Sequence, residues 1–485
     1  MINNKYYNKC ITFGRAAEGL RADFQKQLKE LQSEIGFEYI RFHGLFHDDM
    51  AVYDEDENGH PVLWFGYIDK LFDFLLSVNI KPFVELGFMP GKIATAKNTV
   101  FWWQANGCPP TDYGKWHYLV NETVKHLTER YGIDEVKTWY FEVWNEPNLG
   151  SFFRGTQEEY FKLYEVSVDA VKSVCYDYRV GGPSTSGADF REGLGYLKAF
   201  IDFCNCKKLP VDFFSAHPYP TCWALDEEGT ERMGYISKEI CNEFLDNIKN
   251  IVDNSPYPNA EIHLTEWNSS PSPRDLIHDT PFMAPFILYN ITQNFGKIDS
   301  LGFWTFTDVF EENGPGKSPF HGGFGLINAD GIKKPAYWAY WLLNQLGDEI
   351  VEQSEKHIIT KSGNDYQVII WNYCYYKDNF ADGDRSELTE TNRNHVFKNK
   401  DITIDLSIEL NGEYKQTIYT LDESASALHS WIQMGAPQYP TQKQIKELKE
   451  KSQPLKESCI IHHFKMNETL KPHEVKMFVL EKYEV

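Results

Sequence analysis

The feature that most constrains the fold of this chain is an alternation of short apolar runs with longer stretches of helical period, between about residues 9 and 347. Each short run is rich in β-branched or aromatic residues and is followed by a loop with Gly or Pro, which is typical of a strand. The stretch after each loop has helical spacing. In residues 20–35, for example, apolar side chains recur every three or four positions and would form one apolar side of a helix.

Eight such units predict parallel strands connected by helices, and the number matches a closed (β/α)8 barrel in the α/β class. A doubly wound open sheet is the competing topology, but it does not usually need eight units. The predicted strands are Cys10–Phe13, Tyr39–His43, Lys81–Leu86, Thr138–Trp144, Arg179–Gly182, Asp212–His217, Glu261–Glu266 and Leu301–Thr307. The predicted helices are 21–35, 66–79, 112–131, 157–174, 190–207, 234–253, 281–296 and 335–346.

The pattern changes after residue 347. Residues 401–409 alternate strictly between apolar and polar side chains, which indicates a strand with one buried face. We therefore predict a (β/α)8 barrel over 9–347 and an antiparallel β-sandwich over 348–485, with a short helix near 441–451. The charged stretch 376–399 is expected to be an exposed loop. The predicted sandwich strands are His357–Thr360, Tyr366–Trp371, Asp401–Glu409, Thr417–Leu421, Cys459–His463 and Val475–Leu480.

Charge and composition exclude several classes of function. A net charge of −22 repels phosphate backbones and anionic lipid headgroups, so we expect neither nucleic acid nor membrane partners. The nine cysteines form no paired framework, and we find neither a signal peptide nor an apolar run of membrane-spanning length; a cytoplasmic location is expected. His-Glu-x-x-His, Cys-x-x-Cys and Gly-rich phosphate-binding motifs are absent from the sequence, so we expect no metal and no cofactor.

Functional side chains of such a barrel belong at the carboxyl ends of its strands. The two strongest segments, residues 141–148 and 263–268, each place a carboxylate just past an apolar run, at Glu146 and Glu266. Two carboxyl groups that face each other across a cleft can split a glycosidic bond, because one protonates the departing oxygen while the other attacks the anomeric carbon or activates water. Either Glu alone could be a solvated loop residue, but the pair favours catalysis. Other polar residues at strand ends are Arg41, His43, Glu85, Asn145, His217, Asp308, Glu311 and Glu312.

Further segments narrow the interpretation. They are residues 39–45 (YIRFHGL), 82–90 (PFVELGFMP), 180–183 (VGGP), 303–312 (FWTFTDVFEE), 320–326 (FHGGFGL) and 431–435 (WIQMG). Together with the WNEP segment they resemble glycoside hydrolase family 39, in particular its bacterial β-xylosidases, within a clan of retaining (β/α)8 glycosidases. The resemblance runs nearly end to end. It implies a barrel with a β-sandwich that residues 1–8 join, and a homo-oligomer, often a tetramer.

Carried over residue by residue, the resemblance implies that Glu146 is the general acid/base and Glu266 the nucleophile. The sequence alone does not say which Glu has which environment. Asn145 resembles the residue that binds the sugar 2-hydroxyl, with a capping amide as the alternative. His217 and Tyr219 resemble the pair beside the nucleophile, although His217 could instead be a structural histidine.

Four further residues are expected in the sugar pocket. His43, Glu311 and Glu312 resemble groups that hold the ring hydroxyls of the terminal sugar. Trp304 would be the floor on which the ring packs, with an ordinary core Trp as the alternative.

Arg41 could donate hydrogen bonds that keep Glu266 ionised, or could form a purely structural ion pair. Phe42 and Trp267 depart from the residues usual in the family, and both bear on which sugar is accepted.

The resulting expectation is a retaining exo-β-D-xylosidase that releases xylose from short xylo-oligosaccharides. Alternatives are an arabinosidase or a glucosidase; a uronidase is disfavoured because Glu311 and Glu312 would repel an acidic sugar. A non-catalytic carbohydrate-binding protein is a further alternative, but an intact pair of desolvated carboxylates has no role in binding that offsets its cost.

Overall fold

The computed structural model describes residues 5–187, 190–225, 231–309, 312–424 and 426–483. Eight parallel strands close into a barrel in the order β1-β14-β13-β10-β9-β8-β5-β2, with β1 pairing with both β14 and β2. The predicted barrel is confirmed, and each predicted strand has a counterpart. The barrel strands are β1 (Cys10–Arg15), β2 (Tyr39–His43), β5 (Lys81–Leu86), β8 (Tyr140–Val143), β9 (Arg179–Ser186), β10 (Phe213–His217), β13 (Glu261–Trp267) and β14 (Ser300–Phe303).

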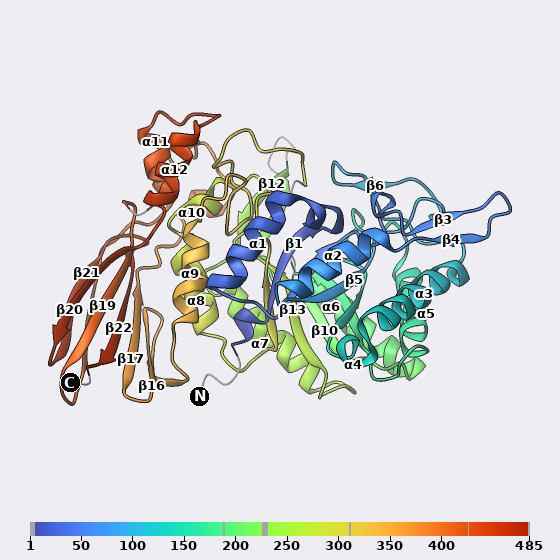
Figure 1. Cartoon of the computed structure of the whole chain (residues 1–485), viewed down its shortest axis with the longest axis horizontal. Helices are drawn as coiled ribbons and strands as arrows, with labels where there is room; N and C mark the ends of the chain where they lie inside the picture. Colours follow the sequence, from blue (N-terminus) through green and yellow to red (C-terminus); the bar gives the residue numbers. More distant parts are fainter. Residues whose placement is uncertain (1–4, 188–189, 226–230, 310–311, 425, 484–485) are drawn as a thin grey trace.

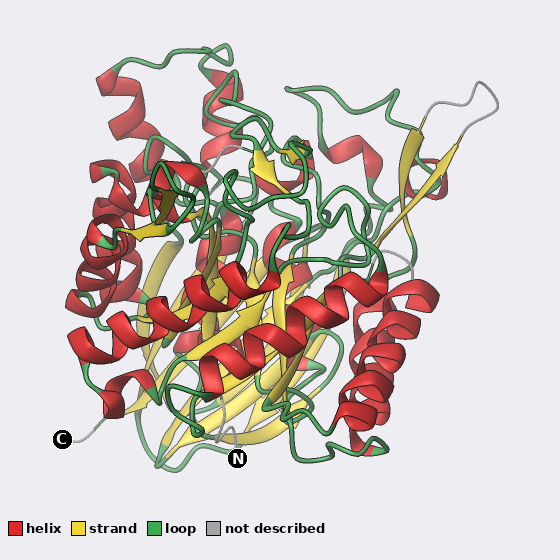
Figure 2. Ribbon diagram, turned by 90° about the vertical axis from the view of Figure 1, so that its right-hand side faces the viewer, coloured by secondary structure: helices red, strands yellow, loops and turns green. Residues whose placement is uncertain are grey.

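Helices surround the barrel strands (Figure 2). Local signals fix where several of them begin: α5 starts with a reciprocal capping box between Thr156 and Glu159, and α9 has Pro335 at its first position. The helices are α1 (Ala22–Glu34), α2 (Gly66–Ser77), α3 (Tyr113–Tyr131), α4 (Ile133–Val136), α5 (Gln157–Lys172), α6 (Phe190–Lys207), α7 (Ile240–Asp253), α8 (Met283–Thr292) and α9 (Pro335–Asn344).

Small hairpins are inserted in the loops that follow barrel strands. They are β3 (Tyr53–Glu55) with β4 (Pro61–Leu63), β6 (Thr99–Val100) with β7 (Ala105–Asn106), and β11 (Thr221–Leu225) with β12 (Glu231–Tyr235). The last of these corrects one prediction. The helix expected from residue 234 begins at Ile240, because residues 234 and 235 pair with β11.

The second domain lies beside the barrel, on the left in Figure 1, and its strands are antiparallel as predicted. A six-stranded sheet, β15-β16-β17-β22-β19-β20, and the pair β18-β21 share an apolar core that includes Val368, Ile404, Phe464 and Phe478. The strands are β15 (Glu349–Gln353), β16 (His357–Ser362), β17 (Asp365–Trp371), β18 (Ile402–Ile408), β19 (Tyr414–Leu421), β20 (Leu455–Ile461), β21 (Phe464–Leu470) and β22 (Val475–Lys482). The helices of this domain are α10 (Asp378–Ala381), α11 (Ala427–Gln433) and α12 (Gln442–Lys451), the last lying at the predicted position.

The stretch 376–399 is not the exposed loop that its charge indicated. Tyr376 and Phe397 are buried, and both rings pack against Phe282 of the barrel at centroid distances of 4.9 Å. Arg393 is also buried, and its guanidinium lies 2.8 Å from Asp279. The prediction fails because the apolar and charged residues of this stretch find partners in the barrel, which lies far away in sequence.

The amino-terminal segment packs on the barrel. Residues 6–8 form a 3-10 helix, in which the hydroxyl groups of two buried tyrosines donate to backbone carbonyls of barrel helices, Tyr6 to Ile291 at 2.8 Å and Tyr7 to Leu343 at 3.0 Å. The expectation that residues 1–8 join the sandwich is therefore wrong for residues 5–8. Residues 1–4 lie outside the described residues.

Candidate active site

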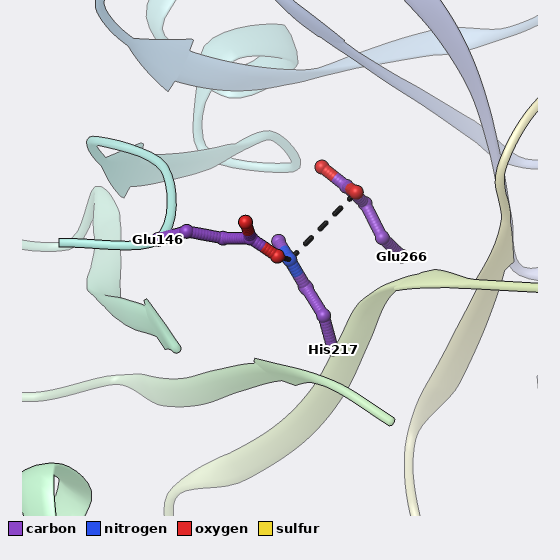
Figure 3. A group of neighbouring side chains, drawn as sticks. All are labelled: Glu146, His217 and Glu266. Atoms are coloured by element: carbon purple, nitrogen blue, oxygen red, sulfur yellow. Dashed lines mark hydrogen bonds and ion pairs between the residues drawn. The ribbon is translucent and has the colours of Figure 1, made fainter. Parts of the chain in front are cut away.

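Two glutamates and a histidine converge at the carboxyl end of the barrel (Figure 3). Glu146 follows β8, Glu266 lies near the end of β13, and His217 is the last residue of β10. One carboxylate oxygen of each Glu and one ring nitrogen of His217 all lie within 4.8 Å of one another. The topology thus brings together the two carboxylates that the sequence singled out.

Arg41 connects the residues beneath this pair. Its side chain is fully buried, and Nη1 lies 2.5 Å from Glu266 Oε1. Nε lies 2.7 Å from Glu142 Oε2, and Nη2 lies 2.9 Å from Glu85 Oε2 and donates to Asn145 Oδ1 at 2.8 Å. A guanidinium remains charged at any ordinary pH, so one buried cation stabilises the ionised form of the carboxylates around it.

Glu266 has further potential donors. The hydroxyl group of Tyr219 donates to its Oε2 at 3.0 Å, and Nε2 of His43 lies 3.5 Å from its Oε1. Nδ1 of His43 lies 2.6 Å from Glu85, which fixes the orientation of the ring. Hydrogen bonds to the charged form of a carboxylate favour ionisation, so this environment suits a nucleophile.

Glu146 has a different environment. It is 5% exposed, and burial raises its pKa from 4.5 to about 7. Its backbone lies in the left-handed region at φ 45°, which is uncommon for a residue other than Gly and recurs at functional sites. A carboxyl group in this state is protonated over much of the range below neutral pH and can act as an acid.

The hydrogen bonds of His217 connect it to Glu146. Burial lowers the pKa of His217 to about 4, so its ring is neutral and has one N–H. Nε2 lies 3.0 Å from Ser184 Oγ and 3.1 Å from Thr265 Oγ1, and Thr265 donates its hydroxyl to Glu142 at 2.9 Å. Nδ1 lies 2.8 Å from Glu146 Oε1, so His217 and Glu146 share one hydrogen bond.

The predicted sugar-binding residues lie beside the pair. Trp304 is buried, and its ring lies 4.7 Å from that of His43 and in one cluster with Tyr219 and Phe324. Glu312 is partly buried, and its pKa is raised well above the usual value by burial and by the charges of Glu266 and Glu146. Glu311 lies outside the described residues.

Two departures from the family pattern do not reach this site. Phe42 faces outward from β2, with its ring 4.7 Å from that of Phe13. Trp267 also faces outward, and its ring stacks on Phe286 at 5.3 Å. Because successive residues of a strand face opposite sides, the neighbours of Arg41 and Glu266 pack between strands and helices.

Some residues of the site were missed by sequence reasoning. Three residues that hydrogen-bond with Arg41 or His217 were not predicted at the site: Glu142, Ser184 and Thr265. A charged residue in the middle of an apolar strand was the available signal for Glu142, since a buried carboxylate needs a partner.

Glu146, His217 and Glu266 have the spacing of a metal-binding group. The charge of Arg41, 2.5 Å from Glu266, opposes a second cation at this position. The arrangement therefore suits proton transfer and nucleophilic attack by the two carboxyl groups better than it suits a metal ion.

Comparisons with known proteins give matches over most of the chain. A sequence model described as glycosyl hydrolases family 39 matches residues 2–466. A β-xylosidase from Caldicellulosiruptor saccharolyticus is 38% identical over 471 residues, covering 94% of this chain and 90% of that protein. A β-xylosidase from Geobacillus stearothermophilus is 36% identical over 452 residues, covering 92% of this chain and 86% of that protein.

Two solved structures are similar to this chain over nearly its whole length. A GH39 enzyme from Xanthomonas axonopodis pv. citri has a TM-score of 0.89 at 31% identity, covering 99% of this chain and 95% of that chain. A monomeric β-xylosidase from Caulobacter crescentus CB15 has a TM-score of 0.88 at 30% identity, covering 99% of this chain and 96% of that chain. Among the described residues, no helix has the combination of length and apolar character needed to cross a membrane.

Proposed function

Because this chain belongs to glycosyl hydrolase family 39, we propose that it is a retaining exo-β-D-xylosidase that releases xylose from xylo-oligosaccharides. The observation that carries the proposal is the pair of opposed environments at Glu146 and Glu266, whose nearest oxygens lie within 4.8 Å. That separation suits direct attack by one carboxylate, whereas an inverting pair is held about 6.5–9.5 Å apart to admit a water molecule.

The reaction proceeds in two displacements. Glu266 attacks the anomeric carbon and forms a covalent ester, while Glu146 gives its proton to the departing glycosidic oxygen. Glu146, now ionised, then takes a proton from a water molecule that attacks the same carbon, and the ester bond to Glu266 breaks. Both residues return to their starting states.

The surrounding residues support this division of roles. Arg41 and Tyr219 donate hydrogen bonds to Glu266 and orient it for attack, and the bond from Arg41 orients the amide of Asn145, which we assign to the 2-hydroxyl of the sugar. His217 shares a hydrogen bond with Glu146 until a glycosidic oxygen takes its place. Removing water from such a site strengthens each of these interactions in the transition state.

His43, Trp304 and Glu312 are proposed to bind the terminal sugar. The carboxyl group of Glu312 can exchange hydrogen bonds with sugar hydroxyl groups, and the Trp304 ring offers an apolar surface to the sugar ring. Glu311 is proposed for the same end of the pocket. Xylose is favoured because two similar proteins that cover most of this chain are β-xylosidases.

The alternatives are an arabinosidase or glucosidase with the same mechanism, or a carbohydrate-binding protein without activity. A binding protein is disfavoured by the desolvated Glu146, since retaining an acid with a pKa near 7 serves proton transfer and not hydroxyl binding. A cytoplasmic location and a homo-oligomer also belong to the proposal.

The test is the hydrolysis of xylobiose followed by proton NMR. An aryl β-xyloside, whose leaving group is not a sugar, gives the stereochemistry: we expect β-xylose as its first product, with the α-anomer appearing only later by mutarotation. A first product with inverted configuration would contradict the double displacement. Intact xylobiose alongside cleaved arabinosides or glucosides would contradict the choice of sugar and leave the mechanism standing.

A further inference from the structure

A second cleft lies at the carboxyl end of the barrel, between the loops after β1 and β2 and the β6–β7 hairpin. Figure 1 places β6 at the same side of the barrel as β3 and β4. The cleft has a volume of about 680 Å³, large enough for several sugar rings. We call it the hairpin-tip cleft; the residues that line it include Arg15, Asp48, Asp49, Trp102, Trp103 and Gln104.

Three consecutive aromatic residues form the tip of the hairpin. Phe101 and Gln104 bound the turn, with φ values of 61° and 62°. Residues other than Gly rarely adopt this left-handed conformation, which is strained and persists mainly where the surrounding structure holds the backbone. The backbone is thus fixed in a form that presents its aromatic side chains in different directions.

The hairpin tip also separates the cleft from the active site. The ring of Phe101 stacks on His43, with centroids 6.0 Å apart and planes at 23°. The backbone N–H of Trp102 donates to the carbonyl oxygen of Glu312 at 3.0 Å. One side of the tip therefore contacts residues proposed to bind the reacting sugar, while the other side forms a wall of the hairpin-tip cleft.

Trp102 gives the cleft an aromatic surface. Its side chain is 49% exposed, although a large aromatic ring normally gains by burial. Arg15 lies over it at 5.7 Å and over Trp103 at 5.1 Å, and Trp103 stacks on Phe101 at 5.3 Å. The Trp102 ring therefore has Arg15 beside it and still keeps about half of its surface exposed, as a stacking platform requires.

The polar groups of the cleft fit a neutral ligand rich in hydroxyl groups. The positive charge of Arg15 is balanced by ion pairs with Asp49 and Glu18. Asp48 accepts a hydrogen bond from the backbone N–H of Gly91 at 2.9 Å and is itself exposed. Lys97 also lines the cleft, so its two cations, Arg15 and Lys97, are matched by two carboxylates, Asp48 and Asp49. A cleft with balanced charges favours a neutral ligand over a phosphate or an acidic sugar, and its exposed carboxylates accept hydrogen bonds from hydroxyl groups.

We propose that the hairpin-tip cleft is a second binding site for a neutral xylo-oligosaccharide, with Trp102 as its stacking platform and Asp48 as a hydroxyl acceptor. The choice of sugar rests on the proposed function, but the site does not depend on the catalytic residues. It would hold part of a longer chain beside the active site.

The experiment first blocks the active site. A 2-deoxy-2-fluoro-β-xyloside with a good leaving group should form a stable ester with Glu266, seen as an added mass on the intact chain. Xylotriose is then titrated calorimetrically into the labelled chain. We expect binding of one xylotriose per chain, and about tenfold weaker binding to the Trp102→Ala variant.

Two further variants make the test specific. Trp64→Ala removes a ring that is similarly exposed, at 48%, but lies outside the cleft, so the affinity for xylotriose should not change. Asp48→Asn keeps the size and the carbonyl acceptor of the side chain and should weaken binding severalfold even if Trp102→Ala folds poorly.

The outcomes separate the two proposals. Absence of the added mass contradicts the proposed function, and the cleft is then tested by the same titration on the unlabelled chain. Lack of xylotriose binding, or equal affinity in the parent and in both cleft variants, overturns the second site. A change of oligomeric state in Trp102→Ala, measured by light scattering, would also overturn it, because the exposed ring would then be a contact between chains.

Discussion

Two glutamates at opposite ends of the barrel show how the same side chain is used differently. At the amino end, Glu261 begins β13; burial alone would raise its pKa, but hydrogen bonds with His263 at 2.8 Å and Tyr140 at 2.5 Å hold it well below the usual value. At the carboxyl end, burial raises the pKa of Glu146 to about 7. The fold stabilises the charge of Glu261 and disfavours that of Glu146.

The two ends of the barrel differ in whether the ionised form of a carboxyl group is stabilised. At the amino end, charged side chains have polar and aromatic partners; the guanidinium of Arg179, for example, lies 3.6 Å above the ring of Tyr140. The carboxyl end keeps an acid whose ionised form is destabilised in the folded protein. Stability is reduced where a proton must later be transferred, which is a common relation between active sites and stability.

Glu266→Gln should have the largest effect, since it removes the proposed nucleophile while keeping its shape. We expect kcat for an aryl β-xyloside to fall by at least about 10⁴-fold. Glu261→Gln, at the other end, should retain kcat close to that of the parent at 25 °C. Similar losses in the two variants would show that a general loss of folding, and not the chemistry, is being measured.

Arg41→Met should cause the largest loss of stability. Removing one partner of a buried ion pair costs about 3–5 kcal/mol, and here Glu85, Glu142 and Glu266 all lose the same cation. Denaturant unfolding monitored by tryptophan fluorescence measures the loss. Arg179→Met at the amino end should cost less, about 1–2 kcal/mol, because that guanidinium is partly exposed. Equal losses would contradict the difference between the two ends.

Glu146→Gln should stabilise the protein at high pH. The carboxyl group has a pKa of about 7 when folded and 4.5 in the unfolded chain, so its ionisation lowers the free energy of unfolding as the pH rises through that range. Above pH 7 the variant should gain up to about 3 kcal/mol relative to the parent. Below pH 4.5 the two should be equal. Unfolding at pH 4 and pH 8 measures both values.

Glu261→Gln should change the free energy of unfolding at high pH in the opposite direction. Its folded pKa is lowered, so its ionised form contributes stability above the unfolded pKa of 4.5 and loses it as the pH falls. The variant should therefore be less stable than the parent at pH 8. A loss of stability in Glu146→Gln at that pH would remove the contrast between the two glutamates.

The rate of the parent enzyme should decrease as the pH rises above about 7, because Glu146 then loses the proton that we propose it donates. The decrease in kcat/KM should be large for xylobiose and small for a xyloside with an activated leaving group, which needs little protonation. A decrease of the same size for both substrates would assign the ionisation to another group.

Tyr140→Phe should have the smallest effect. Glu261 loses one donor but keeps its hydrogen bond with His263, so we expect a loss of about 1 kcal/mol in the free energy of unfolding. Hydrolysis of aryl xylosides should be unchanged. A large change in activity would indicate that the two ends of the barrel are coupled.

The barrel could be predicted from sequence because its strands are short apolar runs at regular intervals. The second domain was harder to predict: β21 was missed, since Lys465, Asn467 and Glu468 interrupt its apolar residues and only pairing with β18 buries the rest. The stretch 376–399 was misjudged for a related reason. Its partners are in the barrel, and local charge does not reveal a distant partner.

In the candidate site, too, local sequence predicted some features, while others depend on residues that are distant in sequence. Glu146 and Glu266 could be predicted because they lie at strand ends in distinctive segments. Their protonation states could not, because these depend on Arg41 and His217, which come from other strands. Glu142 was missed for the opposite reason, since it lies within a strand and binds Arg41 only after the barrel closes.

Arg393 has a consequence for how this chain could be divided. Its guanidinium enters the barrel from the second domain and meets Asp279, which also pairs with Lys334 at 2.7 Å. Lys334 pairs with Asp308 as well, at 2.5 Å, so this group contains two cations and two anions. A gene truncated at residue 347 would encode a catalytic half with an uncompensated negative charge below its sugar-binding loops. Recombination in nature or in the laboratory would therefore have to transfer both halves together.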